Sequence, residues 1–264
     1  MIRLRSLASL GAFAIALPMA LAAQDTAATA PKPKLPQDPP KVSLFDGKTL
    51  TGWRAYKQAD AGRTRWAVSD GLLTLPPKGA GSAGSGDIIT TETFDRFDLT
   101  WEWKIAAGGN SGLKYFVLED RDSAIGHEYQ LIDDEKHADA KIGPHRQTAA
   151  FYDVLAAGSG TFSQQIAAPP VRPTKPAGEW NASRIRVDAS RIVPGSTRVY
   201  HYLNGARVLE YELNSSELNA AIEKSKFKGI ERFGKLQKGH ILLQDHGDQV
   251  WYRNIQISRL TPQS

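Results

Sequence analysis

The segment HEYQLIDD, residues 127–134, places groups that can exchange protons on one face of a strand. In it, Glu128 and Gln130 alternate with Tyr129 and Leu131. Side chains two residues apart on a strand share a face, so the carboxyl and amide groups point one way and the apolar groups the other. We expect the apolar face to meet a core and the polar face to be open to chemistry.

A second segment, GHILLQDHG at residues 239–247, has the same period. The polar residues His240, Gln244 and His246 stand at even positions. The apolar residues Ile241 and Leu243 stand at odd positions. Carboxyl and imidazole groups are common general acids and bases, and amides can donate to reacting oxygens. We predict that Glu128, Gln244 and His246 meet in one cleft, although they are far apart in the sequence.

Three further charged residues fall on the polar faces of predicted strands. Glu102 and Lys104 lie in DLTWEWKI, residues 98–105, and Lys114 lies in SGLKYFVL, residues 111–118. These charges can line a concave sheet together with the polar residues above. The alternative is a set of cross-strand ion pairs on a solvated face.

Short alternating segments dominate the chain and must position these residues. They are residues 98–105, 111–118, 127–133, 149–155, 183–188, 198–204, 207–213, 240–245 and 252–258. Many short strands with almost no helical periodicity indicate an antiparallel sandwich or barrel. Asn204-Gly205 predicts a two-residue hairpin turn. The one expected helix is residues 214–227, where Asn214 can cap and Glu217 can close a capping box.

Alternation also assigns the residues that face the core. The two clearest apolar stripes are Leu99, Trp101, Trp103 and Ile105, and Leu113, Tyr115 and Val117. We predict that Trp101, Trp103, Tyr115, Tyr129 and Leu243 face inward between two sheets. One bulge would invert part of this assignment.

The N-terminal region predicts export. Residues 1–23 have the layout of a signal peptide: Arg3 and Arg5 precede an apolar run, and small residues prepare cleavage after Ala22 or Ala23. The run is too short for a good membrane anchor, so no membrane attachment is expected after cleavage. Residues 24–41, rich in Pro and Ala, read as an extended linker, and residues 42–262 as one sheet domain. The expected location is periplasmic or secreted.

Composition excludes other classes. The chain has no cysteine, so neither a lipoprotein anchor nor disulfides are available and the fold must rest on burial. The net charge of +5 comes from Lys and Arg scattered among acids, whereas a nucleic-acid partner would need a clustered basic face. The oligomeric state is left open.

Seven segments carry a resemblance that covers essentially the whole chain after residue 42. They are LFDGKTLTGW (44–53), GGNSGLKYFV (108–117), HEYQLIDDEKHAD (127–139), TAAFYDVLA (148–156), GEWNASRIRV (178–187), HYLNGARVLEYE (201–212) and GHILLQDHGDQVWYRNIQI (239–257). In this order they resemble the bacterial 3-keto-disaccharide hydrolase family, formerly a domain of unknown function. The resemblance implies an all-β fold, a two-sheet antiparallel jelly-roll sandwich similar to concanavalin-A-like lectins and glucanases.

The resemblance also implies a chemistry that the residue types can support. A ketone at C3 of a sugar acidifies the hydrogen at C2, and the resulting enolate can expel the glycosidic oxygen at C1. We expect Glu128 and His246 to be the catalytic acid and base. The residues expected to bind the oligosaccharide or glycoside substrate are Asn110, Lys114, Gln130, Asp133, Gln244 and Tyr152. No cofactor is expected, because the keto group arrives ready-made and no dinucleotide-binding motif follows a strand.

Two other functions remain open. Endo-glucanases of the laminarinase type carry E-x-D-x-x-E on a concave strand, and here the same spacing reads Glu128, Gln130 and Asp133, which alters the two-carboxylate machinery. A carbohydrate-binding module without catalysis would use Trp180, Trp251 and Tyr152 as stacking surfaces. For the Trp residues, core packing is the competing interpretation.

Metal binding is the remaining option. His127, His137 and His145 lie near Asp133, Asp134 and Asp139 in the sequence. No tight ligand spacing of the H-x-x-x-H sort occurs among them, and the aspartates can simply shape the turn after the strand. We therefore expect no metal.

Overall fold

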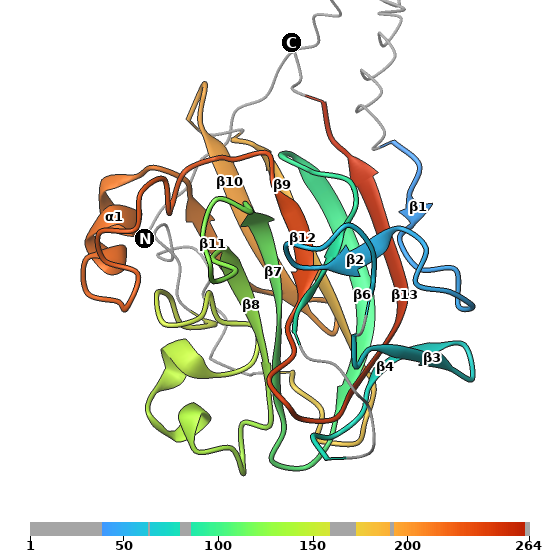
Figure 1. Cartoon of the computed structure of the whole chain (residues 1–264). Helices are drawn as coiled ribbons and strands as arrows, with labels where there is room; N and C mark the ends of the chain where they lie inside the picture. Colours follow the sequence, from blue (N-terminus) through green and yellow to red (C-terminus); the bar gives the residue numbers. More distant parts are fainter. Residues whose placement is uncertain (1–38, 63, 80–85, 159–172, 191–192, 262–264) are drawn as a thin grey trace, which may run out of the picture. The chain divides into compact units, whose positions relative to one another are not determined.

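Thirteen strands in two antiparallel sheets form the framework of the computed structural model (Figure 1). The structure describes residues 39–62, 64–79, 86–158, 173–190 and 193–261. The predicted signal peptide and nearly all of the predicted linker lie outside these residues, so both stay predictions. In the described ranges no helix is both long and apolar enough to span a membrane.

The larger sheet has eight strands in the order β11-β10-β9-β6-β13-β4-β3, with β1 paired to β13. Their bounds are β1 Val42–Ser43, β3 Ala67–Ser69, β4 Leu72–Leu75, β6 Phe97–Ile105, β9 Asn181–Ala189, β10 Thr197–Leu203, β11 Ala206–Glu212 and β13 Val250–Arg259. The predicted hairpin joins β10 to β11, where Asn204 and Gly205 both have positive φ, as a tight two-residue turn requires.

The smaller sheet has five strands in the order β2-β5-β12-β7-β8. Their bounds are β2 Trp53–Ala55, β5 Ile88–Thr90, β7 Asn110–Val117, β8 His127–Ile132 and β12 His240–Leu243. Two short 3₁₀ turns, η1 (Asp139–Lys141) and η2 (Pro144–Arg146), follow β8. The predicted two-sheet antiparallel jelly roll is confirmed.

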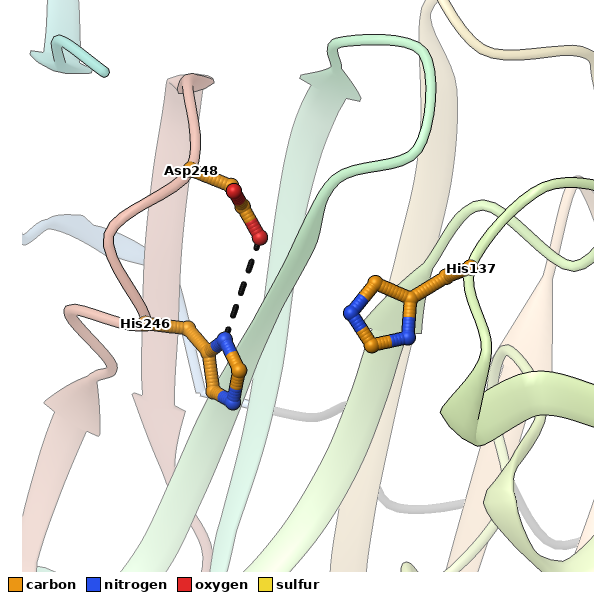
Figure 2. Close-up of side chains that lie close together, drawn as sticks. All are labelled: His137, His246 and Asp248. Atoms are coloured by element: carbon orange, nitrogen blue, oxygen red, sulfur yellow. Dashed lines mark ion pairs between the residues drawn. The ribbon is translucent and has the colours of Figure 1, made fainter. Parts of the chain in front are cut away.

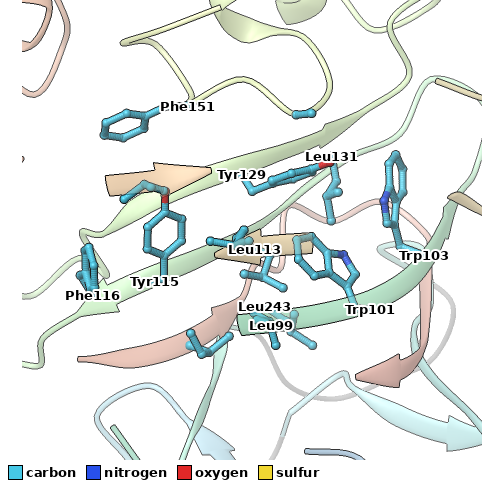
Figure 3. Close-up of a cluster of buried hydrophobic side chains, with 14 of the residues drawn as sticks. Leu99, Trp101, Trp103, Leu113, Tyr115, Phe116, Tyr129, Leu131, Phe151 and Leu243 are labelled. Atoms are coloured by element: carbon cyan, nitrogen blue, oxygen red, sulfur yellow. The ribbon is translucent and has the colours of Figure 1, made fainter. Parts of the chain in front are cut away.

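The core fills the space between the two sheets (Figure 3). Trp101, Trp103, Tyr115, Tyr129 and Leu243 all belong to it, as the alternation predicted. The Trp101 and Tyr129 rings, one from each sheet, meet edge to face with their centroids 5.0 Å apart. This contact orients the even-numbered residues of β8 away from the core.

A bulge corrects one stripe of the prediction. Phe116 has φ 59°, and both Tyr115 and Phe116 enter the core, so Val117 leaves it. Val117 packs instead on the outer face of the smaller sheet, in a second apolar cluster with Ile89 and Leu242. An extra residue in a strand shifts the alternation by one, which is why period two failed there.

Two predicted elements differ from the structure. Residues 149–155 are not a strand but a loop held by isolated bridges, because Ala149 and Asp153 have positive φ. The helix α1 runs only over Ser216–Ile222. Its cap is Ser215, whose hydroxyl accepts from the Leu218 amide, and Asn214 lies outside the helix at φ 60°. With Leu218 at the third helical position, no capping box forms.

A buried chain of hydrogen bonds crosses between the sheets. The Gly234 amide donates to His127 Nε2, and His201 Nδ1 donates to the Ala149 carbonyl. Because these two ends fix the protons, His127 donates to the Tyr211 hydroxyl, Tyr211 to the Tyr115 hydroxyl, and Tyr115 to His201 Nε2. Every side-chain polar atom in this series of hydrogen bonds has a partner, and both imidazoles are neutral.

We predict that acid destabilises the protein through these two histidines. Burial lowers the pKa of His127 to about 3 and that of His201 to about 4, from 6.5. Between pH 6.5 and 4 the unfolded chain therefore binds more protons than the folded one. The free energy of unfolding should be highest above pH 6.5 and fall by several kcal/mol toward pH 4. Urea unfolding at pH 7.0 and 4.5 measures it.

The ¹⁵N chemical shifts of the two imidazoles supply the control. Both rings should remain neutral, with the proton on Nδ1, at pH 5 in the folded protein. A ring that titrates near pH 6.5 would contradict the buried chain.

Candidate active site

A cavity of about 480 Å³ opens on the outer face of the smaller sheet. Its floor comes from residues that alternate with the core residues of β7 and β8 and from the loops that flank β5 and β12. Its walls come from the loop after β7 and from the segment after α1. The polar lining includes Tyr56, Asp87, Asp122, Lys114, Glu128, Lys226 and Gln244.

Glu128 lies at the centre of this floor and is 5% exposed. Strands β7 and β8 pair Lys114 with Glu128 and Gly112 with Gln130. The carboxylate lies across Gly112, where an added Cβ would stand 2.3 Å from Glu128 Oε1. Glycine is therefore required at position 112 for this rotamer of Glu128.

The surroundings of Glu128 act on its pKa in both directions. Burial raises the pKa of the Glu128 carboxyl and Asp87 adds to the rise, while Lys114, Lys226 and His246 oppose it. Lys114 Nζ is 4.0 Å from Glu128 Oε2. A buried carboxyl with a raised pKa is a candidate for acid-base chemistry.

Asp87 is a second carboxyl in the cavity that sequence reasoning missed. Burial raises its pKa, while Lys114 and the Asp245 amide oppose the rise. The Asp245 N–H donates to Asp87 Oδ1 at 2.8 Å, and Arg65 pairs with Asp245 below it at 3.2 Å. Asp87 follows a Gly/Ser-rich stretch of the sequence and belongs to no alternating segment. Lys226 was missed too, because it lay inside the helix expected over residues 214–227, whereas the observed helix ends at Ile222.

The predicted substrate-binding residues divide into two groups. Lys114 and Gln244 line the cavity together with Glu128. Asp133 does not, because its carboxylate accepts from the amides of Gly108, Glu135 and Lys136 and shapes the turn after β8. That is the structural role weighed for Asp133 from the sequence.

Gln130 and Tyr152 also lie outside the cavity lining. Gln130 is buried, and its amide contacts the Arg146 carbonyl at 3.5 Å. The Tyr152 hydroxyl donates to Asp139, and Lys226 Nζ lies 4.2 Å from the centre of the Tyr152 ring. Tyr152 thus borders the cavity through Lys226.

His246 lies two residues beyond Gln244, in the loop between β12 and β13. Its Nε2 is 3.4 Å from Asn110 Nδ2, and its Nδ1 is 3.8 Å from Asp248 Oδ2. His137, from the turn after β8, faces His246 and Asp248 (Figure 2). Glu128 and Gln244 share the cavity, whereas His246 is not part of its lining, and its part in catalysis stays a prediction.

The charges of the larger sheet do not belong to this site. Glu102 is on β6, where it pairs with Arg253 at 2.7 Å. Lys104 lies 4.5 Å from the centre of the Trp251 ring. Their strand is in the other sheet, so these two charges do not line one surface with Glu128, and the Glu102–Arg253 contact is a cross-strand ion pair, as the alternative interpretation had it. Lys104 and Arg253 also cover the Trp180 ring, which leaves its face less free for a sugar.

The histidines grouped from the sequence do not gather. His127 is in the core and His145 lies 3.7 Å from Asp153. Of the three, only His137 approaches another histidine, and its neighbour is the distant His246.

Comparison with known proteins gives one family match and several relatives. The model of the 3-keto-alpha-glucoside-1,2-lyase-like domain matches residues 40–258. A curated Bacteroides thetaiotaomicron protein named 3-keto-disaccharide hydrolase is 34% identical over 246 residues, 83% of this chain and 78% of that protein.

Two crystal structures from Parabacteroides distasonis are also similar. Both belong to candidate glycosyl hydrolases. The first has a TM-score of 0.67 and 27% identity, covering 84% of this chain and 94% of the other. The second has a TM-score of 0.57 and 24% identity, covering 84% and 100%. At that identity the second supports the fold alone.

We predict that Lys114→Met raises the pKa of Glu128 further. The Lys114 ammonium opposes the effect of burial, so its loss removes a charge that favours the carboxylate. The titration of ¹³C-labelled glutamate carboxyls by NMR measures the shift. Lys224→Met, at the exposed end of α1, should leave the Glu128 titration unchanged. A Glu128 pKa that falls or stays constant in Lys114→Met would show that the ammonium does not act on it.

Proposed function

The chain belongs to the 3-keto-alpha-glucoside-1,2-lyase-like domain family, and from this premise we propose that it cleaves the glycosidic bond of 3-keto-glycosides and 3-keto-disaccharides. Because it belongs to this family, the protein is a carbohydrate hydrolase. The observation that supports the proposal is Glu128, a buried carboxyl with a raised pKa in a cavity of about 480 Å³. Cavities of roughly this size bind small molecules.

The reaction proceeds through acid-base steps at C2 and O1. A base takes the C2 proton, which the C3 ketone has acidified, and the electron pair enters the enolate. The pair then forms a C1=C2 double bond as the C1–O bond breaks. The leaving oxygen keeps the bonding pair and takes a proton. Water then adds its hydroxyl to C1 and its proton to C2, so that the sum of the steps is hydrolysis.

The residues of the cavity supply these steps. Glu128 is the base at C2, because desolvation makes its carboxylate a stronger base than an exposed one. Asp87, whose pKa burial also raises, protonates the leaving oxygen. Lys114 and Gln244 donate to sugar oxygens beside Glu128. His246, which lies next to Asn110, keeps the acid or base role that the sequence predicted for it.

The laminarinase-like alternative is less well supported. Retaining hydrolysis needs two carboxyl groups facing one glycosidic bond. Of the three residues at that spacing, Asp133 is held by three backbone amides and Gln130 is buried under a loop.

Product analysis in D₂O tests the mechanism. The wild-type protein should release the aglycone from a 3-keto-glucoside and place solvent deuterium at C2 of the sugar product, as seen by NMR. The unoxidised glucoside should be inert. Direct hydrolysis would leave protium at C2. Cleavage of plain β-glucan would favour the endo-glucanase, and binding without turnover would favour a carbohydrate-binding module.

We predict that Glu128→Gln lowers turnover by about a hundredfold or more, the usual effect of losing a general base. His246→Ala should have an effect of similar size, with sugar binding retained in both variants. Glu102→Gln is the matched control, since Glu102 also faces outward but on the larger sheet. Equal activity of Glu128→Gln and the wild type would remove Glu128 from the mechanism.

We also propose export to the periplasm or the medium. The support is the sequence of residues 1–23, with two arginines before an apolar run and small residues at its end. N-terminal sequencing of the protein from its native host should begin at Ala23 or Gln24. Recovery of the full-length chain from the cytoplasm would contradict export.

A further inference from the structure

Three side chains from two distant segments gather beside the cavity. His137, His246 and Asp248 each offer one ligand atom, and these atoms all lie within 4.8 Å of one another. Figure 2 shows the two rings and the carboxylate turned toward a common space. One ion pair joins two members of the group, since His246 Nδ1 is 3.8 Å from Asp248 Oδ2, a distance longer than a hydrogen bond. This pair does not account for the position of His137.

Asn110 adds a second, independent observation. It is 5% exposed, its Oδ1 is buried without a hydrogen-bond partner, and its Nδ2 is 3.4 Å from His246 Nε2. The two ends of a carboxamide differ only by a flip, so the free oxygen can occupy the position beside His246. An unpaired buried carbonyl oxygen is destabilising, and a cation beside His246 would give it a partner.

The surroundings already hold Asp248 in place. The Asn110 amide N–H donates to Asp248 Oδ2 at 2.9 Å, which fixes this carboxylate against the start of β7. An outer contact of this kind commonly orients a metal ligand.

We propose that His137, His246 and Asp248 bind a divalent transition-metal ion, with Asn110 Oδ1 as a fourth ligand. Two imidazoles and a carboxylate with open positions suit Mn²⁺, Fe²⁺, Co²⁺ or Zn²⁺ better than Mg²⁺ or Ca²⁺, which prefer oxygen ligands throughout. This proposal replaces the expectation of no metal, which considered only ligands close in sequence.

His137 must move its ring proton from Nε2 to Nδ1 before it can bind the ion through Nε2. The Asp139 N–H occupies the lone pair of Nδ1, so the neutral ring carries its proton on Nε2. Coordination through Nε2 moves that proton to Nδ1 and opens the contact with Asp139. The turn at residues 137–139 therefore shifts when the ion binds.

The place of the site gives the ion a role that rests on the proposed function. Asn110 is two residues from Gly112, which lies under the Glu128 carboxylate, and both face the same side of β7. Residues two apart on a strand are roughly 7 Å apart, so one sugar can reach both groups. A 3-keto sugar has an oxygen on C3 and another on C2, which together chelate a cation. The ion would withdraw electrons from the ketone while Glu128 takes the C2 proton.

Titration of EDTA-treated full-length protein with Co²⁺, followed by visible absorption and by metal analysis after dialysis, tests the site. We expect one ion per chain. His246→Ala and Asp248→Asn should each weaken Co²⁺ binding by at least about tenfold, the smaller effect known for losing even an outer contact. Both side chains are more than a third exposed, so the variants should keep the melting temperature of the wild type.

His145→Ala is the matched control, because His145 is partly exposed and lies 3.7 Å from a carboxylate outside the cluster. It should bind Co²⁺ as the wild type does. No Co²⁺ binding, or equal binding by all variants, would overturn the site. Full turnover of a 3-keto-glucoside by the EDTA-treated protein would overturn the chelating role. If Co²⁺ binds as expected and no 3-keto-glucoside is turned over, the proposed function fails and the metal site stands.

Discussion

The hydrogen-bond chain from His127 through Tyr211 and Tyr115 to His201 is the constraint on which the rest of the structure depends. A buried polar group costs free energy unless it is paired, so four such side chains fit between two sheets in one register only. His127 and Tyr115 belong to the smaller sheet, and His201 and Tyr211 to the larger one. The chain therefore fixes how the two sheets face each other in a protein without disulfides.

This register presents the candidate active site on the opposite side of the same strands. With His127 and Tyr129 held inward, Glu128 must point outward, and Gly112 leaves room for its carboxylate. The loop after β7 and the segment after α1 then cover the outer face and remove Glu128 from water. Burial from both sides of one sheet thus produces a stable core below the strand and a carboxyl of raised pKa above it.

Sequence reasoning succeeded where period two alone decides. It placed Trp101, Trp103 and Tyr129 in the core and Glu128 outside it, because each strand is regular there. It misplaced Val117, since a bulge at Phe116 cannot be seen in an alternating pattern. Sheet membership was also hidden, so the sequence left open whether the charges of β6 share a face with Glu128. Asp87, Lys226 and the approach of His137 to Asp248 depend on loop contacts that no local pattern encodes.

The histidines show how the structure separates support from chemistry. Both ring nitrogens of His127 and of His201 have hydrogen-bond partners, and burial keeps these rings neutral. His246 is exposed and meets its neighbours only at 3.4 and 3.8 Å. The same contrast holds for the aspartates, because Asp133 is held by three amides whereas Asp87 keeps a raised pKa in the cavity. Groups whose bonds are complete hold the fold, whereas Glu128, Asp87 and the unpaired Asn110 Oδ1 lie along the outer side of the smaller sheet, where a ligand can complete their bonds.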